Sequence, residues 1–310
     1  MTFNRRHDVR WGLVMNHTNR GGFADVKVER LFPPHAGEAA EAAPPETALP
    51  PAEGLFARDG EDYLPLPLSH GPFDALHGGA IGGLLANAAE ALAAREDMGT
   101  PIAAHIQFLR PLKSDHRLIV FAEVAQPGRR LNLVDAFIEV EGALRAEGRF
   151  TFARDIDIPG LAELPNAPQH DPLSFPVIEP PHRPGRTWFK DALEWREAPG
   201  GTVWIRGLTE LGPEAHALPR VIAAADWSAG ISRPDGWSRP RAAAFPNSAL
   251  SVNLWRRPIG DWIGLTPRSR WGRTGFGMAE AILSDSHGEI GAATMPVILL
   301  PFPEKTAPTA

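Results

Sequence analysis

Between residues 79 and 96 an apolar side chain recurs every three or four positions. That spacing predicts a helix with one buried stripe. Gly82, Gly83 and Ala86 lie in the same segment, and such small residues would let another backbone come close. Thr100-Pro101 ends the pattern, because a proline pushes the residue before it out of the helical region. The stripe consists of Ile81, Leu84, Leu85, Ala88, Ala89 and Leu92.

Four stretches rich in strand-forming residues follow this helix. Apolar and other residues alternate most clearly at Leu118, Val120, Ala122 and Val124, as expected for half-buried strands. One long helix followed by a run of antiparallel strands indicates an α+β fold rather than repeated βαβ units. The four stretches are residues 102–109, 117–124, 131–140 and 144–152.

The same order of elements recurs in the second half of the chain. Phe108-Leu109-Arg110-Pro111 is echoed by Leu254-Trp255-Arg256-Arg257-Pro258, and Gly128-Arg129-Arg130 by Gly272-Arg273-Thr274. Together these echoes indicate an internal duplication. The predicted second-half elements are strands at 188–197 and 202–208, a helix at 218–232, and strands at 245–256, 261–269, 274–284 and 290–300.

Two proline-rich segments divide the chain. Residues 33–54 contain Pro, Ala and Glu with few large apolar side chains, so they are predicted to be a linker or a disordered stretch. The residues before them form an appendage in which 23–29 could make one strand. The expected organisation is an N-terminal appendage with a Pro/Ala-rich linker at 1–54, a first unit at 55–158, a linker at 159–183 and a second unit at 184–303.

Composition excludes several classes of function. The net charge is -6 without long runs of either sign, which argues against a general nucleic-acid binder. The chain has no cysteine, so disulfides, thiolate metal sites and a cysteine nucleophile are excluded. No signal-peptide pattern is present, and no stretch approaches the roughly 20 apolar residues that span a bilayer. We therefore expect a cytoplasmic protein without a membrane span.

The segment PLSHGPFDALHGGAIGGLLANAAE, at residues 67–90, resembles the opening of double-hotdog acyl-CoA thioesterases of the acyl-CoA thioesterase II type. HIQFLRPL, FPNSALSVNLWRRPIGDW and LSDSHGEIGAAT are similar to later parts of the same family, so the likeness covers roughly residues 55–300. The resemblance implies two hotdogs in one chain, each a long helix wrapped by a curved antiparallel sheet. It also implies hydrolysis of a fatty acyl-CoA thioester by water, with no metal and no cofactor.

The predicted start of the first helix offers groups suited to this chemistry. Free N–H groups and the positive dipole end could hold an oxyanion, and Gly78 and Gly79 would let a carbonyl approach closely. These glycines could instead serve only tight helix–sheet packing. His77 could contact the ligand or be a structural residue. Related single-hotdog enzymes carry an acid about nine positions after this histidine, where Ala86 stands here; Asn87 beside it is a candidate oxyanion- or substrate-binding residue.

The resemblance places the catalytic aspartate at Asp226, within the apolar segment VIAAADWSAGI. A buried carboxylate there would be costly unless it is used or paired; the alternative is a solvent-facing or capping residue. Asn247 falls where the family has a residue that helps to hold the water, although it could also be a turn residue after Pro246. Ser251 is a further candidate substrate-binding residue. Two departures from the family are Ala249 in place of an Asp and Met295 in place of a glutamine.

Arg110, Arg256 and Arg257 are candidates for binding the phosphates of coenzyme A, or else they are solvated strand ends. The resemblance implies an acyl-CoA substrate and allows a homo-oligomer of double-hotdog chains. Two functions follow: an acyl-CoA thioesterase, or a non-catalytic acyl-CoA- or lipid-binding protein on the same fold. Met295 and Ala249 favour the second.

Overall fold

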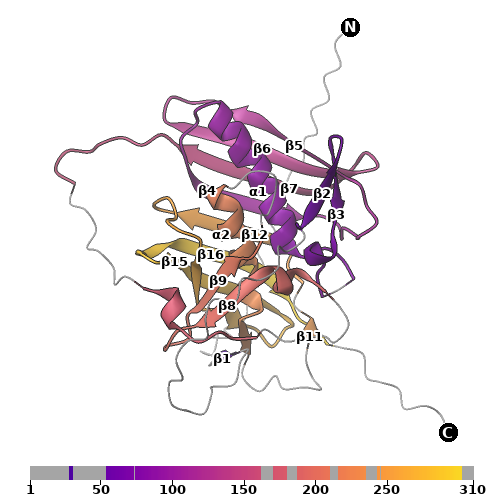
Figure 1. Cartoon of the computed structure of the whole chain (residues 1–310), viewed down its shortest axis with the longest axis vertical. Coiled ribbons are helices and arrows are strands. Elements are labelled where there is room, and N and C mark those ends of the chain that lie inside the picture. Colours follow the sequence, from indigo (N-terminus) through magenta and orange to yellow (C-terminus); the bar gives the residue numbers. More distant parts are fainter. Residues whose placement is uncertain are drawn as a thin grey trace, which may run out of the picture.

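The computed structural model describes residues 28–30, 54–72, 74–161, 170–179, 187–209, 216–234, 243–244 and 246–301. Two units of the same connectivity follow one another along the chain (Figure 1). In the first, two short strands precede a helix and four longer strands follow it. Its elements are β2 (Phe56–Asp59), β3 (Asp62–Pro65), the 3-10 turn η1 (Pro67–Ser69), α1 (Gly78–Arg95), β4 (Thr100–Phe108), β5 (Leu118–Gln126), β6 (Leu131–Val140) and β7 (Ala143–Ala153).

The second unit repeats this plan, with the two-residue strand β14 added beside β15. Its main elements are the 3-10 turn η3 (Phe189–Ala192), β8 (Leu193–Glu197), β9 (Val203–Gly207), α2 (Ala217–Ala225), the 3-10 turn η4 (Asp226–Ala229), β12 (Ala249–Leu254), β13 (Ile263–Pro267), β14 (Arg270–Trp271), β15 (Phe276–Asp285) and β16 (Gly288–Ile298). Smaller elements are β1 (Val28–Arg30), η2 (Pro172–Ser174), β10 (Ser232–Pro234), β11 (Ala243–Ala244) and β17 (Leu300–Pro301).

One antiparallel sheet runs through both units. Its order is β2-β3-β5-β6-β7-β4 in the first half and β12-β16-β15-β13-β9-β8 in the second, so the second half mirrors the first. The halves join where β4 pairs with β12, with His105 opposite Ser251. This mirrored order confirms both the internal duplication and the double hotdog.

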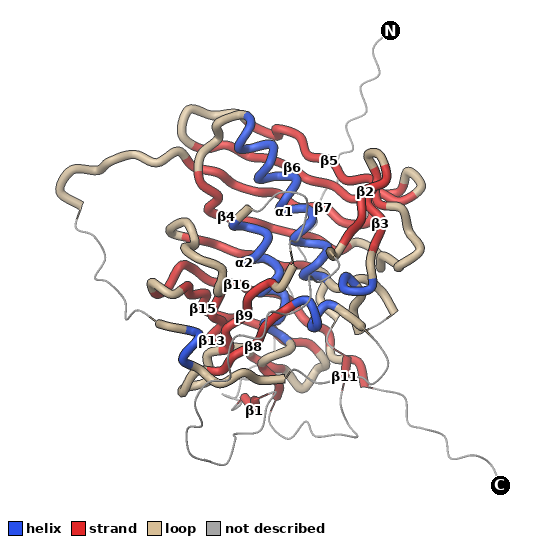
Figure 2. The backbone as a smooth tube through the Cα atoms, in the orientation of Figure 1, coloured by secondary structure: helices blue, strands red, loops and turns tan. Residues whose placement is uncertain are grey.

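Both helices lie on one face of this sheet (Figure 2). Alternate strand residues point toward them, as the period of two in a strand requires. In β6, for example, Val134, Ala136 and Ile138 are fully buried, whereas the residues between them are not. The core is therefore the layer between the helices and the inner face of the sheet.

Glycines bring the two helices into close contact. The start of α1 lies beside the end of α2, so the helices pack antiparallel. A Cβ atom at Gly79 would lie 2.9 Å from the carbonyl oxygen of Ala223, and one at Gly82 would lie 2.7 Å from a methyl group of Ile222. Of the small residues predicted to allow a close approach, Gly82 lies at this contact, and the approaching element is the second helix.

The second helix is shorter than the sequence pattern predicts. The prediction of a helix over 218–232 is wrong beyond Ala225, where the α-helix gives way to the turn η4 and then to the strand β10. Within η4, the Ser228 hydroxyl donates to the carbonyl of Ala225 at 2.7 Å, which satisfies an acceptor left over at the end of the helix. Likewise, residues 189–192 of the predicted strand 188–197 form a 3-10 turn instead.

The flanking segments contact the second unit where they are described. β1 pairs with β10, the strand that follows η4. This part of the N-terminal appendage therefore forms a short strand, which overlaps the end of the predicted segment 23–29 and extends to Arg30. Of the predicted linker at 33–54, only Gly54 lies within the described residues. In the second linker, the His170 N–H donates to the carbonyl of Ser286 at 2.9 Å.

The contact at Gly82 predicts a clear effect on stability. Because a valine there would collide with Ile222, Gly82→Val should lower the free energy of unfolding by about 1–3 kcal/mol, the usual cost of overpacking a core. Ala91→Val, at a half-buried position on the same helix, is the matched control and should change stability by much less. Thermal unfolding of the two variants checks this, and equal effects would contradict the close helix contact.

Candidate active site

His77 caps the start of α1. Its backbone is extended, and its Nδ1 lies 3.1 Å from the Gly79 N–H, one of the donors that a helix start leaves without a partner. The loop before it is held in place, because the Leu76 N–H donates to the carbonyl of Leu112 and the His77 N–H to that of Ser69. The imidazole is therefore fixed against the helix start.

The second half of the chain brings a carboxylate to this point. Asp226 is the first residue of η4, and its side chain is only 4% exposed. One oxygen, Oδ2, lies 3.1 Å from His77 Nδ1. The other, Oδ1, accepts a hydrogen bond of 2.9 Å from Asn247 Nδ2. Three of the predicted site residues, from three separate segments, thus meet in one cluster, in which the His77 and Asp226 side chains are buried and Asn247 is partly buried.

Gly78 separates the Asp226 carboxylate from the start of α1. A Cβ atom at position 78 would lie 2.8 Å from both carboxylate oxygens, so a side chain there would displace the carboxylate. The Gly78 N–H has no hydrogen-bond acceptor within the described residues. Gly79 has a packing role, since a Cβ there would lie 2.8 Å from the ring of Phe189. Both glycines therefore allow close packing, Gly78 against the Asp226 carboxylate and Gly79 against Phe189.

Aromatic rings enclose the His77 imidazole. The ring centroid of Trp227 lies 4.5 Å away in a stacked arrangement, that of Phe189 4.7 Å away and that of Trp188 6.4 Å away. No pattern in the sequence linked Trp227, Phe189 and Trp188 to His77. A site walled by aromatic rings has a low local dielectric constant, which strengthens the polar contacts inside it.

The Nδ1 atom of His77 faces a donor and an acceptor at once. It can accept from the Gly79 N–H only when it carries no proton, and it can donate to Asp226 only when it does. Moving a proton onto Nδ1 therefore strengthens the contact with Asp226 and releases the Gly79 N–H. This cluster couples the protonation of one imidazole nitrogen to a free helix-start donor.

Two other predicted residues lie away from the cluster. Asn87 is buried on α1, ten residues and so about 15 Å along the helix from His77. Ser251 hydrogen-bonds His105 at 3.2 Å on the opposite face of the sheet from the helices, since its neighbours Leu250 and Val252 fill the core. The structure does not bring either of them to Asp226.

The two positions that depart from the family also lie on different faces. Met295 is 1% exposed and points to the helix side, like Val297, which bridges to Asn247. Alternation along β12 places Ala249 on the outer face with Ser251. Met295 is thus the departure that lies on the side of the cluster.

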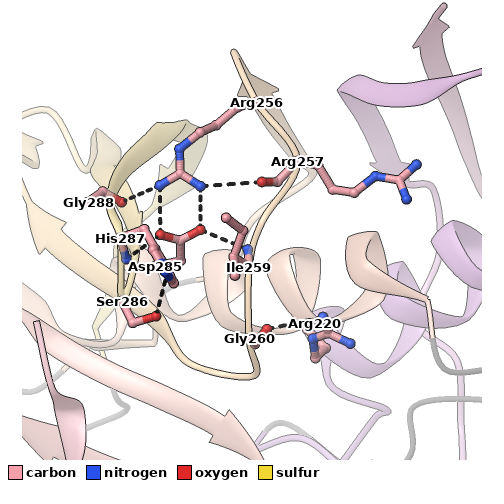
Figure 3. Close-up of polar contacts among 9 residues, drawn as sticks. All are labelled: Arg220, Arg256, Arg257, Ile259, Gly260, Asp285, Ser286, His287 and Gly288. Carbon is pink, nitrogen blue, oxygen red and sulfur yellow. Dashed lines mark hydrogen bonds and ion pairs between the residues drawn. The ribbon is translucent and has the colours of Figure 1, made fainter. Parts of the chain in front are cut away.

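Of the three candidate arginines, Arg256 already has a partner inside the protein (Figure 3). Its guanidinium forms two hydrogen bonds with Asp285, of 2.5 and 2.7 Å, and Asp285 is completely buried. Arg257 is exposed and belongs to the same turn, which Gly260 connects to Arg220 on the first turn of α2. This network shapes the turn after β12.

Arg110 is the first-half counterpart of Arg256. Val140 ends β6 where Asp285 ends β15, so the carboxylate that holds Arg256 has no equivalent at the end of β6. Its side chain is exposed and has no ion-pair partner among the described residues. It lies two residues before Leu112, whose carbonyl binds the residue preceding His77. Of the three arginines proposed to bind coenzyme A phosphates, Arg110 therefore lies closest in sequence to the start of α1.

The environment of Asp285 has opposing effects on its acidity. Burial alone would raise the pKa of this carboxyl group. Hydrogen bonds from Arg256 and from the N–H groups of Ile259 and His287 outweigh burial, and they hold the pKa of Asp285 below its usual value. The carboxylate is thus kept ionised as a structural anchor.

Within the described residues, no group of three or more His, Cys, Asp or Glu side chains is arranged to hold a metal ion. In the same part of the chain, no helix is both long and apolar enough to cross a membrane.

Comparison with known proteins gives a consistent family. Residues 66–153 match the family model of the acyl-CoA thioesterase N-terminal domain, and residues 161–295 match that of the C-terminal domain. A search of curated proteins found no match.

Several solved structures share the fold. A hot dog protein from Alicyclobacillus acidocaldarius is 15% identical with a TM-score of 0.58, over 82% of this chain and 96% of that one. A proposed thioesterase from Novosphingobium aromaticivorans is 20% identical with a TM-score of 0.59, and the match covers 79% of this chain and 98% of that one. An acyl-CoA thioesterase II from Mycobacterium marinum is 14% identical with a TM-score of 0.54, and the match covers 81% of this chain and 97% of that one.

The Arg256–Asp285 pair predicts an acid-sensitive anchor. Asp285→Asn removes a fully buried carboxylate and leaves the partly buried Arg256 guanidinium poorly paired, so it should lower stability at neutral pH by about 3 kcal/mol. Because the pKa of Asp285 is lower in the folded state, the stabilisation by this carboxylate exists above the unfolded pKa of about 4 and disappears as the pH falls below it.

Urea unfolding at pH 7 and pH 3 measures this dependence. The difference between wild type and Asp285→Asn should be larger at pH 7. Asp135→Asn is the control, since its partner Arg149 is largely exposed and the pair should contribute about 1 kcal/mol or less. A pH-independent difference for Asp285→Asn would contradict the ionised anchor.

Proposed function

Because the chain belongs to the acyl-CoA thioesterase family, we propose that it hydrolyses a fatty acyl-CoA at the cluster of His77, Asp226 and Asn247. The observation that carries this proposal is the buried Asp226 carboxylate held at the start of α1 by an imidazole and an amide. A buried acid in contact with titratable and hydrogen-bonding partners is typical of a working site.

The proposed reaction uses Asp226 as the general base. Asp226 removes a proton from a water molecule while the water oxygen attacks the thioester carbonyl carbon. Asn247 donates to Oδ1 and so fixes the orientation of the carboxylate. The C–S bond then breaks, the proton passes to the thiolate sulfur, and the products are the free fatty acid and coenzyme A.

The helix start stabilises the negative charge that develops on the carbonyl oxygen. The Gly78 N–H is the available donor, and the Gly79 N–H joins it when His77 Nδ1 is protonated and turns its hydrogen toward Asp226. Two backbone donors at a helix start, in a site walled by aromatic rings, are suited to an oxyanion. His77 would thus act on both the base and the oxyanion site.

A second function, a non-catalytic acyl-CoA- or lipid-binding protein, is favoured by Met295. The side chain is buried on the side of the cluster, where the family resemblance implies a glutamine, and a thioether cannot orient water as an amide does. Release of free thiol from acyl-CoAs of different chain length separates the two functions. Binding without release would support the second.

The general-base role predicts a large effect of Asp226→Asn. The substitution keeps the shape and removes the basic carboxylate, so kcat should fall by about 10²- to 10⁴-fold, with the Kd of a non-hydrolysable acyl-CoA little changed. Single-turnover kinetics and calorimetry measure the two quantities. If Asp226 is only structural, kcat per folded molecule will stay near the wild-type value while stability falls by about 1 kcal/mol.

Arg110 should bind a phosphate of the coenzyme A moiety. A charge-assisted hydrogen bond contributes about 1.5–3 kcal/mol, so Arg110→Ala should raise KM for acyl-CoA by roughly tenfold or more without changing kcat. The same variant should handle acyl-pantetheine, which lacks the nucleotide phosphates, like the wild type.

Arg95→Ala, at the opposite end of α1, is the matched control for Arg110→Ala. Steady-state kinetics with both substrates should leave this control unchanged. An equal rise in KM with acyl-pantetheine would show that Arg110 does not act on the phosphates.

A further inference from the structure

The duplication creates a second contact between the halves, at the start of α2. Each helix has a histidine at its N-cap, His77 in α1 and His216 in α2. Ten residues after the second histidine stands Asp226, and ten residues after the first stands Asn87. Since the helices are antiparallel, the start of α2 meets the later part of α1 just as the start of α1 meets Asp226. The cluster at His77 thus has a counterpart at His216.

At this second helix start, Glu90 of α1 occupies a backbone N–H of α2. Its Oε2 accepts a hydrogen bond of 2.8 Å from the N–H of Leu218. Leu218 is the second residue of α2, as Gly79 is the second residue of α1, so Glu90 occupies a donor equivalent to one proposed for the oxyanion. Both Glu90 and Leu218 are buried.

Asn87 is compatible with a second helix start whose N–H is already occupied by Glu90. Its side-chain oxygen is buried and has no hydrogen-bond partner among the described residues. An aspartate at this position would stand three residues from Glu90 on the same helix, where like charges repel. The neutral amide avoids that repulsion, but it also removes the base that the counterpart would need.

We propose that Glu90 is a positioning residue for Asp226, an inference that rests on the proposed function. Glu90 caps α2 from the other helix and so fixes the start of α2, whereas Asp226 follows its end. The α-helix has nine residues, or about 13 Å, so a shift of its first turn is carried directly to η4. A carboxylate at a helix start is also favoured by the helix dipole.

The second anchor of α2 is weaker. Arg220, whose side chain is 27% exposed, donates to the carbonyl of Gly260 at 3.2 Å, and its ion-pair contact with Asp261 is 3.9 Å long. The bond of 2.8 Å from Leu218 to Glu90 is shorter than these contacts, and both of its residues are buried. Loss of Glu90 should let the first turn of α2 move while the sheet remains intact.

The test compares Glu90→Ala with Glu90→Gln. Glu90→Ala removes the acceptor, so kcat should fall at least tenfold with KM within about twofold of wild type, whereas the Gln carbonyl can still accept from Leu218 and should restore most of kcat. Glu96→Ala, an exposed carboxylate at the end of α1, is the control and should leave kcat unchanged. Activities are compared per folded molecule, well below the melting temperature.

Two results would overturn the proposal: wild-type kcat in Glu90→Ala, or an equal loss in Glu90→Gln, which would mean that charge rather than acceptance of the Leu218 N–H matters. Hydrogen exchange over residues 217–229 gives a readout that needs no activity. Protection there should fall in Glu90→Ala and recover in Glu90→Gln. An inactive wild type with this exchange pattern would refute the proposed function while leaving the α2 anchor standing, and unchanged protection would refute the anchor itself.

Discussion

The close approach of α1 and α2 is the contact on which the site depends. Side chains larger than hydrogen at Gly79 or Gly82 would push the helices apart, and one at Gly78 would displace the Asp226 carboxylate. With glycine at these positions, the end of one helix reaches the start of the other. The carboxylate of the second half then contacts the imidazole of the first and lies beside Gly78. Neither half contains this arrangement alone.

The duplication supplies the arrangement twice, and the sequence has since diverged between the two copies. At the start of α1, a histidine faces an aspartate, and a glycine leaves room beside them. At the start of α2, Glu90 takes the helix donor and Asn87 stands where the base would be. The arginines diverged in the same sense, since Arg256 is bound to Asp285, whereas Arg110 is exposed and has no ion-pair partner in the described part of the chain. One copy has become structural support for the other.

The sequence predicted the fold well because hydrophobic periodicity reports burial directly. The first helix and the strands of the first half were found within a few residues, and the repeated order indicated the duplication. The end of α2 was missed, since VIAAADWSAGI continues a helical pattern while Ser228 and the following turn end the helix. Local spacing does not show where a side chain caps its own helix.

The site was predictable only in part. His77, Asp226 and Asn247 were named through the family resemblance, but their mutual contact spans two halves of the chain and no spacing rule encodes it. The signal that singled out Asp226, an acid within an apolar helix, applies equally to Glu90 in ANAAEALAA and was not used there. Ser251 lies on the face of the sheet away from the cluster, and its sequence position alone did not show which face it would occupy, because neighbouring strand residues point to opposite sides.

The central claim is that His77 and Asp226, from different halves, act as one unit. A double-mutant cycle in kcat/KM with His77→Ala and Asp226→Asn measures this coupling directly. If the contact of 3.1 Å is the working unit, the double variant will be about as slow as the slower single variant. Losses that multiply in the double variant would show that the two residues act independently, and they would contradict a site shared between the halves.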